Sequence, residues 1–288
     1  MKVSYECASC MMRQSREAIE NAVEDTEKRM DATVKVLSYL EENFKKGVQS
    51  NKLGTDLHTM IMNETKNPDP YKQLRENGNR IAQKIVPKIR KHIEENPTLE
   101  QYVKAAVVGN IIDFGALEQD TDMEKMIMDN IDKEAVINDT QLLDESLKSA
   151  TKILYLADNG GEIVFDKLLI EKIKQDYDVE IILAVKKGPI LNDALLADAK
   201  NLKLDELTTL ITTGAASVGI VEDYVSDELK DLMENVDFII SKGMGNYEGL
   251  SEMEVNTPIF YLLTTKCNVI SKELKVGVKS IVIMKSVN

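Results

Sequence analysis

The first half of the chain repeats its hydrophobic positions with the period of an α-helix. Between residues 8 and 148, apolar side chains recur at steps of three or four residues, or at sums of such steps. The periodic positions include Ile19, Val23, Met30, Val34 and Leu37. Pro68 and Pro70 break the pattern, because proline removes a backbone hydrogen bond and clashes with the preceding turn. The pattern predicts about six helices before residue 150.

After residue 150 the pattern changes to short apolar runs, separated by stretches of helical period. This alternation is typical of parallel βαβ units. Residues 162–175 and 227–235 are candidate crossover helices. The candidate strands are residues 151–157, 179–185, 207–213, 236–241, 257–263 and 280–285. The sequence therefore predicts an α/β protein: a helical domain at residues 1–150, then a Rossmann-like three-layer α/β/α domain with a mostly parallel sheet at residues 151–288.

Composition narrows the classes of function. The formal net charge of −13 over 288 residues disfavours a nucleic-acid partner, because binding to phosphate backbones relies on a basic surface. Neither end carries the long apolar run of a signal peptide or membrane helix, so we expect a cytoplasmic protein without a membrane partner. With only two histidines, histidine-rich metal sites have few candidate ligands. The pattern carries no signal for an oligomeric state.

Polar residues follow three of the predicted strands. Asp158 and Asn159 come after the first strand, and Asn192 and Asp193 follow the second. Because the carboxyl ends of parallel strands form one edge of a sheet, we expect these groups to meet there. Their oxygen atoms suit a hard divalent ion such as Mg²⁺ or Mn²⁺, with water and substrate phosphate completing the coordination.

The third predicted strand that polar residues follow leads into the segment "SKGMGNYE", which contains Lys242, Gly243 and Asn246. A lysine and the backbone N–H groups of a glycine loop can hold a phosphate. The segment lacks the three-glycine dinucleotide fingerprint and the Walker pattern, so it can equally be a plain glycine turn. Likewise, Asp158 with its following glycines can be a turn with a helix cap, and Asn192 or Asp193 can be the cap of a second helix. The coincidence of all three favours a site.

Two other phosphatase chemistries do not fit the sequence. A haloacid dehalogenase requires a second aspartate two residues after the first, and Gly160 stands at that position. A cysteine phosphatase requires a cysteine and an arginine around a phosphate loop, and none of the three cysteines has that setting.

Several motifs together resemble the damage-control phosphatase family, long catalogued as domain of unknown function 89. They are "CASCMMRQ", "NPDPYKQLRENGN", "GNIIDFG", "DNGGE", "KGPILNDALLADA" and "SKGMGNYE", which span nearly the whole chain. The resemblance implies a metal-dependent phosphatase of metabolite repair, acting on sugar phosphates or on damaged or side-product phosphate esters. It also implies that Asp158, Asn159 and Asp193 hold the metal, Mg²⁺, Mn²⁺, Co²⁺ or Ni²⁺, and that Lys242 contacts phosphate.

Further residues are candidates for the substrate site. Those next to the predicted metal are Glu162, Asn192, Gly243 and Asn246. In the helical half, Asn110 and Asp113 are polar residues within an apolar stretch, and are either satisfied turn groups or substrate contacts. "DPYKQLRENGN" raises the same question for Asp69, Asn77 and Asn79.

Cys7 and Cys10 have Cys-x-x-Cys spacing, and Cys267 opens a predicted late helix. They are either reduced, partly buried thiols or a structural zinc or redox site that joins the N-terminus to the second domain. A thiolate zinc site usually has four ligands, and the chain contains no fourth cysteine.

The leading hypothesis is a divalent-metal-dependent phosphatase in which Asp158 or a neighbouring carboxylate orients the attacking water and Lys242 stabilises the phosphoryl charge. The rival is a non-catalytic module that binds a phosphorylated metabolite or nucleotide in the same cleft, and turnover distinguishes the two. A carboxyl methyltransferase, an activity described for some larger relatives, is a weaker alternative, because nothing in the sequence indicates a methyl-donor site.

Overall fold

The computed structural model describes residues 1–109 and 123–286. Its helices are α1 (Tyr5–Ala22), α2 (Thr26–Asn43), α3 (Ser50–Thr65), α4 (Lys72–Glu94), α5 (Leu99–Val108), α6 (Met123–Ile131), α7 (Thr140–Ser149), α8 (Glu162–Asp176), α9 (Leu196–Asn201), α10 (Asp227–Asn235), α11 (Gly243–Leu250) and α12 (Asn268–Glu273), with a short 3-10 helix at Leu204–Glu206.

Seven strands form one sheet in the order β1-β7-β6-β5-β2-β3-β4. They are β1 (Ile137–Asn138), β2 (Lys152–Leu156), β3 (Glu180–Val185), β4 (Thr209–Thr212), β5 (Phe238–Lys242), β6 (Ile259–Thr264) and β7 (Ile281–Lys285). All neighbours pair in parallel except β6 and β7, which are antiparallel. The chain runs outward from β2 through β3 and β4, then returns to the other side of β2 with β5, and ligands bind at such a reversal in open parallel sheets.

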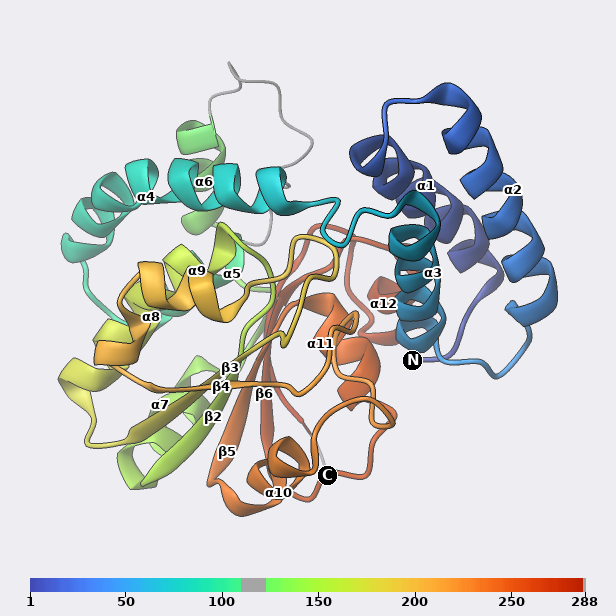
Figure 1. Cartoon of the computed structure of the whole chain (residues 1–288). Helices are drawn as coiled ribbons and strands as arrows, with labels where there is room; N and C mark the ends of the chain where they lie inside the picture. Colours follow the sequence, from blue (N-terminus) through green and yellow to red (C-terminus); the bar gives the residue numbers. More distant parts are fainter. Residues whose placement is uncertain (110–122, 287–288) are drawn as a thin grey trace.

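Helices cover both faces of the sheet, as Figure 1 shows. Alternate side chains of β2 point to opposite faces, so that Tyr155 packs in one hydrophobic cluster and Leu156 in the other. The first cluster includes residues of α4 to α9, and the second includes residues of α10, α11 and α12. Burial on both faces explains why the strands read as continuous apolar runs.

Helices α1 to α3 have a hydrophobic core of their own, which contains Ile19, Val36 and Leu57. In Figure 1 this three-helix unit stands beside the α/β layers. Hydrogen bonds connect it to the loop before α10: Asn51 donates to the carbonyl of Ile220, and the Thr55 hydroxyl accepts from the backbone N–H of Val218. The unit is therefore fixed against the loops that follow the strands.

The predicted fold class is confirmed. The six predicted strands correspond to β2 through β7, and residues 227–235 form α10 as expected. The sequence did not predict β1, because two residues are too short for a period to be read. Seven helices, against the roughly six predicted, lie in residues 1–109 and 123–150. The division of the chain at residue 150 stays a prediction. No helix of the described residues is sufficiently long and apolar to span a bilayer.

Candidate active site

The loops after β2, β3, β4 and β6, together with α11, border a cavity of about 1110 Å³. Its opposite wall comes from α1 and the first turns of α3. Asp158, Asn159, Asn192 and Asp193 all line this cavity. The structure thus brings together the three predicted metal ligands, which come from two separate strand ends.

Backbone hydrogen bonds hold the first two loops side by side. The carbonyl of Asp158 accepts from the N–H of Ala194 at 2.8 Å, and the N–H of Gly160 donates to the carbonyl of Asn192 at 2.7 Å. Asn159 and Asp193 form an isolated antiparallel bridge between these contacts. The chain after β3 has reversed direction here, since β2 and β3 themselves pair in parallel. These contacts place both aspartates on one wall.

Burial makes the charges of this wall costly. Asp158 is 8% exposed and Asp193 is 3% exposed. Burial raises the pKa of Asp158 well above its usual range, and the nearby carboxylates of Glu162 and Asp193 raise it further. Burial likewise raises the pKa of Asp193 to about 6, although the Lys186 ammonium, 3.6 Å from Asp193 Oδ2, acts in the opposite direction. A bound divalent cation would compensate this concentration of carboxylates.

The donor set fits a hard cation with few protein ligands. Asp193 Oδ2 is buried and accepts no hydrogen bond from any described residue, so it has a lone pair available for an ion. In residues 1–109 and 123–286 no three His, Cys, Asp or Glu side chains are grouped as a metal site. The candidate therefore comprises two carboxylates and the amide of Asn159, and Mg²⁺ commonly keeps several waters beside one or two carboxylates.

The Asn159 amide nitrogen donates to Asp158 Oδ2 at 2.9 Å and to Glu162 Oε2 at 3.3 Å. Glu162 begins α8, is fully buried and does not line the cavity. Lys242 is also fully buried and forms an ion pair with Glu162 beneath the loop. The structure thus places these two predicted substrate and phosphate contacts behind the cavity wall, and a direct role for either stays a prediction.

The glycine-containing segment is the start of a helix. α11 begins at Gly243, whose φ of +76° is favourable only for glycine, and an added Cβ there would lie 1.8 Å from Asp158 Oδ2. Asn246 is fully buried, and its amide nitrogen donates to the carbonyls of Ala157 and Lys242. Gly243 and Asn246 therefore support the Asp158 loop from behind, while Gly245 of the same segment lines the cavity.

The helical half supports the same loop from the other side. Asn79 on α4 accepts from the N–H of Gly161 at 2.6 Å and donates to Asp198 at 2.7 Å. Asp69 binds Arg75 through both carboxylate oxygens. Neither Asp69 nor Asn79 lines the cavity, and Asn77 contacts Arg80 at the surface. Asn110 and Asp113 lie outside the described residues.

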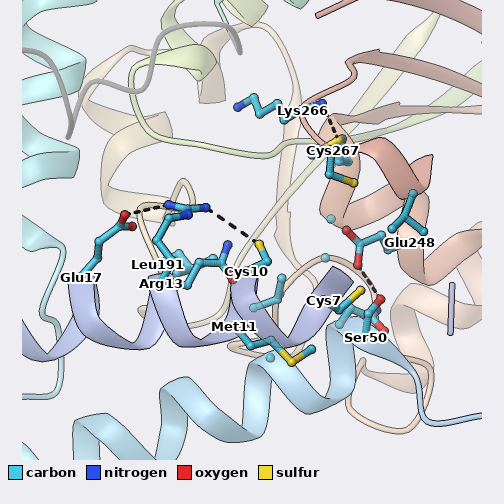
Figure 2. A pocket seen from close by; sticks show the side chains of 18 of the residues that line it. Cys7, Cys10, Met11, Arg13, Glu17, Ser50, Leu191, Glu248, Lys266 and Cys267 are labelled. Atoms are coloured by element: carbon cyan, nitrogen blue, oxygen red, sulfur yellow. Dashed lines mark hydrogen bonds and ion pairs between the residues drawn. The ribbon is translucent and has the colours of Figure 1, made fainter. Parts of the chain in front are cut away.

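Lys266, two residues beyond β6, was missed by the sequence reasoning. It is exposed, it lines the cavity, and Figure 2 shows it on the same side as Cys267. Its charge lowers the pKa of Asp158, although burial and the acidic neighbours raise that pKa more strongly. Among the described residues, its ammonium has no ion-pair or hydrogen-bond partner. The available signal was its position just after β6, a strand that pairs in parallel with β5.

The three thiols are free and all line the cavity (Figure 2). Cys7 and Cys10 lie on α1, and Cys267 is the residue before α12. Burial raises the pKa of Cys7 and of Cys267, which keeps these thiols protonated. No metal-binding group that includes them occurs in the described part of the chain. A structural zinc or redox pair therefore gains no support here and stays a prediction.

The fold and this cavity define a Rossmann-like α/β protein with a candidate hard-cation site at its strand ends. The family described as "Damage-control phosphatase ARMT1-like domain" matches residues 3–282. A damage-control phosphatase of Pyrococcus horikoshii is 34% identical over 99% of both chains, and one of Archaeoglobus fulgidus is 30% identical over 98% of both. A Methanocaldococcus jannaschii protein named as uncharacterised is 37% identical over 99% of this chain and 96% of its own.

The fold gives the same result. A crystal structure of a DUF89 family protein from Pyrococcus horikoshii superposes with a TM-score of 0.90, at 34% identity and over 99% of both chains. The chain belongs to the damage-control phosphatase ARMT1-like family.

Proposed function

We propose that this protein is a divalent-metal-dependent phosphatase that hydrolyses small phosphorylated metabolites, either sugar phosphates or damaged and side-product phosphate esters. Membership of the damage-control phosphatase family supports the reaction. The observation that carries the proposal is the convergence of Asp158, Asn159 and Asp193 on one cavity, with a buried Asp193 oxygen that accepts no hydrogen bond from the described residues.

The two carboxylates and the Asn159 amide would hold Mg²⁺, Mn²⁺, Co²⁺ or Ni²⁺. When bound, such an ion supplies Lewis-acid stabilisation of the phosphoryl oxygens and lowers the pKa of a coordinated water. Asp158 would also accept a hydrogen bond from the attacking water and orient it. Lys186, which donates to the carbonyl of Gly219 at 2.7 Å, fixes the position of Asp193 from behind.

Lys266 is the group on the cavity wall best placed to receive the phosphate. It lines the same cavity as Asp158 and lowers the pKa of that carboxyl through its charge, and a charge-assisted hydrogen bond from its ammonium would stabilise the phosphoryl oxygens. The far wall on α1 offers Gln14, Glu17 and Asn21. Amide and carboxylate side chains bind hydroxyl groups well, so this wall favours a phosphate ester with a hydroxyl-rich remainder.

Phosphate release from p-nitrophenyl phosphate and a panel of sugar phosphates tests the proposal. Chelator-treated protein should be inactive and should recover activity on addition of Mg²⁺, Mn²⁺, Co²⁺ or Ni²⁺. Asp158→Ala should lower kcat by more than about 100-fold, because removal of even an outer-shell partner of a metal costs about 10- to 100-fold. Asp205→Ala, a change of an exposed aspartate, is the matched control. No turnover by folded, metal-loaded protein would favour a binding module instead.

The role of Lys266 has its own test. Lys266→Gln should lower kcat/KM by about 10- to 100-fold, since a hydrogen bond to a charged group contributes about 1.5–3 kcal/mol. The inhibition constant of inorganic phosphate should rise in parallel, while the affinity for Mn²⁺ should change little. Lys46→Gln, which alters an exposed lysine outside the cavity, is the control. If the Lys266 variant has the kinetic constants of the wild type, Lys266 does not bind the phosphate.

A further inference from the structure

Lys242 has no donor left for a substrate. An ammonium carries three N–H groups, and all three are used: Nζ donates to the carbonyl of Ala106 at 2.9 Å, to Glu162 Oε1 at 2.5 Å and to Asp166 Oδ1 at 2.5 Å. Its side chain is 0% exposed and does not line the cavity. A phosphate in the cavity would have to break this buried arrangement to reach it.

Glu162 connects Lys242 to Asn159 on the cavity wall. Glu162 uses one carboxylate oxygen for Lys242 and the other, Oε2, for the amide nitrogen of Asn159. The second N–H of that amide is directed at Asp158 Oδ2. With both N–H groups committed to carboxylates, the orientation of the Asn159 amide is fixed, and its oxygen faces away from them.

The two carboxylates around Lys242 explain why an ammonium is needed between them. Glu162 and Asp166 are both fully buried, and both contact Lys242. Tyr155 adds a hydrogen bond to Asp166 but no charge. Without the ammonium, two buried carboxylates would face one another unpaired and would repel each other. This repulsion would displace Glu162 from its contact with Asn159.

We infer that Lys242 is a positioning residue for the metal site: it fixes Glu162, which in turn orients the Asn159 amide as a neutral metal ligand. The inference rests on the proposed metal-dependent function, and it gives Lys242 a different role from direct phosphate contact. Outer-shell partners of this kind orient metal ligands and affect affinity without touching the ion.

Calorimetric titration with Mn²⁺ separates the two roles. Lys242→Met should weaken Mn²⁺ binding by about 10- to 100-fold, whereas KM measured at saturating Mn²⁺ should stay close to that of the wild type. The double variant Lys242→Met/Glu162→Gln removes the unpaired charge and keeps a carbonyl oxygen for Asn159, so it should recover part of the lost affinity. Lys148→Met, which removes an exposed ion pair with Asp144, is the control for the substitution itself.

The opposite pattern would overturn the inference. If Lys242→Met binds Mn²⁺ as the wild type does, but KM and the inhibition constant of inorganic phosphate rise, Lys242 contacts phosphate directly. Should Lys242→Met fail to fold, Glu162→Ala, which removes the acceptor of the Asn159 amide, must weaken Mn²⁺ binding and leave the phosphate constant unchanged, and an unchanged Mn²⁺ affinity would refute the inference. Lys242-dependent Mn²⁺ binding without turnover would contradict the phosphatase proposal only, and absence of Mn²⁺ binding by the wild type would contradict both.

Discussion

Gly243 lies so close to the Asp158 carboxylate that no side chain fits between them. The two residues follow adjacent strands, β5 and β2, at the point where the order of the sheet reverses. Close backbone approach is the physical reason for a glycine at this position, in addition to its positive φ. A single atom there should therefore affect the proposed metal site directly.

Gly243→Ala is expected to displace the Asp158 carboxylate, because the new Cβ would lie 1.8 Å from its Oδ2. Mn²⁺ affinity and kcat should both fall, together with the melting temperature. Gly47→Ala is the matched control, since Gly47 also has a positive φ, +92°, but nothing lies within 4 Å of the added carbon. The control should lose about 1 kcal/mol of stability from backbone strain and keep its activity. Equal losses in the two variants would refute the steric argument.

Individual residues also show what the sequence can predict about a site. Asp158, Asn159 and Asp193 were predicted to lie together because they follow strands, and the structure places all three on one cavity. Lys242 meets the same criterion, yet it lies beneath the wall. A linear pattern locates the end of a strand, but the direction of a side chain there depends on what packs around it.

Between elements, α4 supports the loop before α8 through a contact across 82 residues of sequence. Asn79 accepts from the N–H of Gly161, the residue that turns the chain with a φ of +78° into α8. No period or composition reveals such a pair, because the two residues meet only after α4 has packed on α8. The strands were predictable for the opposite reason: each is defined by its own apolar run.

Asn79→Ala should loosen the Asp158 loop although Asn79 does not line the cavity. Loss of the bond to the Gly161 N–H and of the bond to Asp198 should cost about 1–3 kcal/mol of unfolding free energy. Mn²⁺ affinity should fall as well. Asn77→Ala on the same helix is the control, because Asn77 is half-buried and, among the described residues, its side chain bonds to Arg80 at the surface and not to the Asp158 loop. A loss of stability in the Asn77 variant as large as in the Asn79 variant would argue against a specific support.

At the scale of the whole molecule, the cavity lies where the α1 to α3 unit meets the strand-end loops. His58 on α3 belongs to this unit, and burial lowers its pKa to about 4 from an ordinary value of 6.5. As the pH falls, His58 therefore binds a proton near pH 6.5 in the unfolded chain, but only near pH 4 in the folded chain. The folded state loses stability as the pH falls through that window.

Chemical denaturation at pH 7.5 and pH 5 measures this effect. The wild type should lose about 2 kcal/mol more than His58→Gln between these two pH values, because only the wild type has a buried imidazole to protonate. The other histidine, His92, is 30% exposed, so His92→Gln is the control for the substitution itself. A His58 variant with the same pH dependence as the wild type would contradict the assigned burial effect.

The site as a whole depends on the approach of two units that the sequence describes only separately. Periodicity predicts helices in the first half of the chain and strands alternating with helices in the second. The family resemblance implied the chemistry. The position of α1 opposite Lys266 results from tertiary contacts such as Asn51 with Ile220. Those contacts set the size of the cavity, and through it the substrates that fit.

The most direct test of the central claim is a crystal structure grown with Mn²⁺ and inorganic phosphate, in which anomalous scattering locates the ion. We predict that Mn²⁺ is bound by the side-chain oxygens of Asp158, Asn159 and Asp193, with phosphate between the ion and Lys266. An ordered Mn²⁺ ion elsewhere, for instance at the thiols of α1, would contradict the account. So would a cavity without metal in crystals of protein whose turnover requires Mn²⁺.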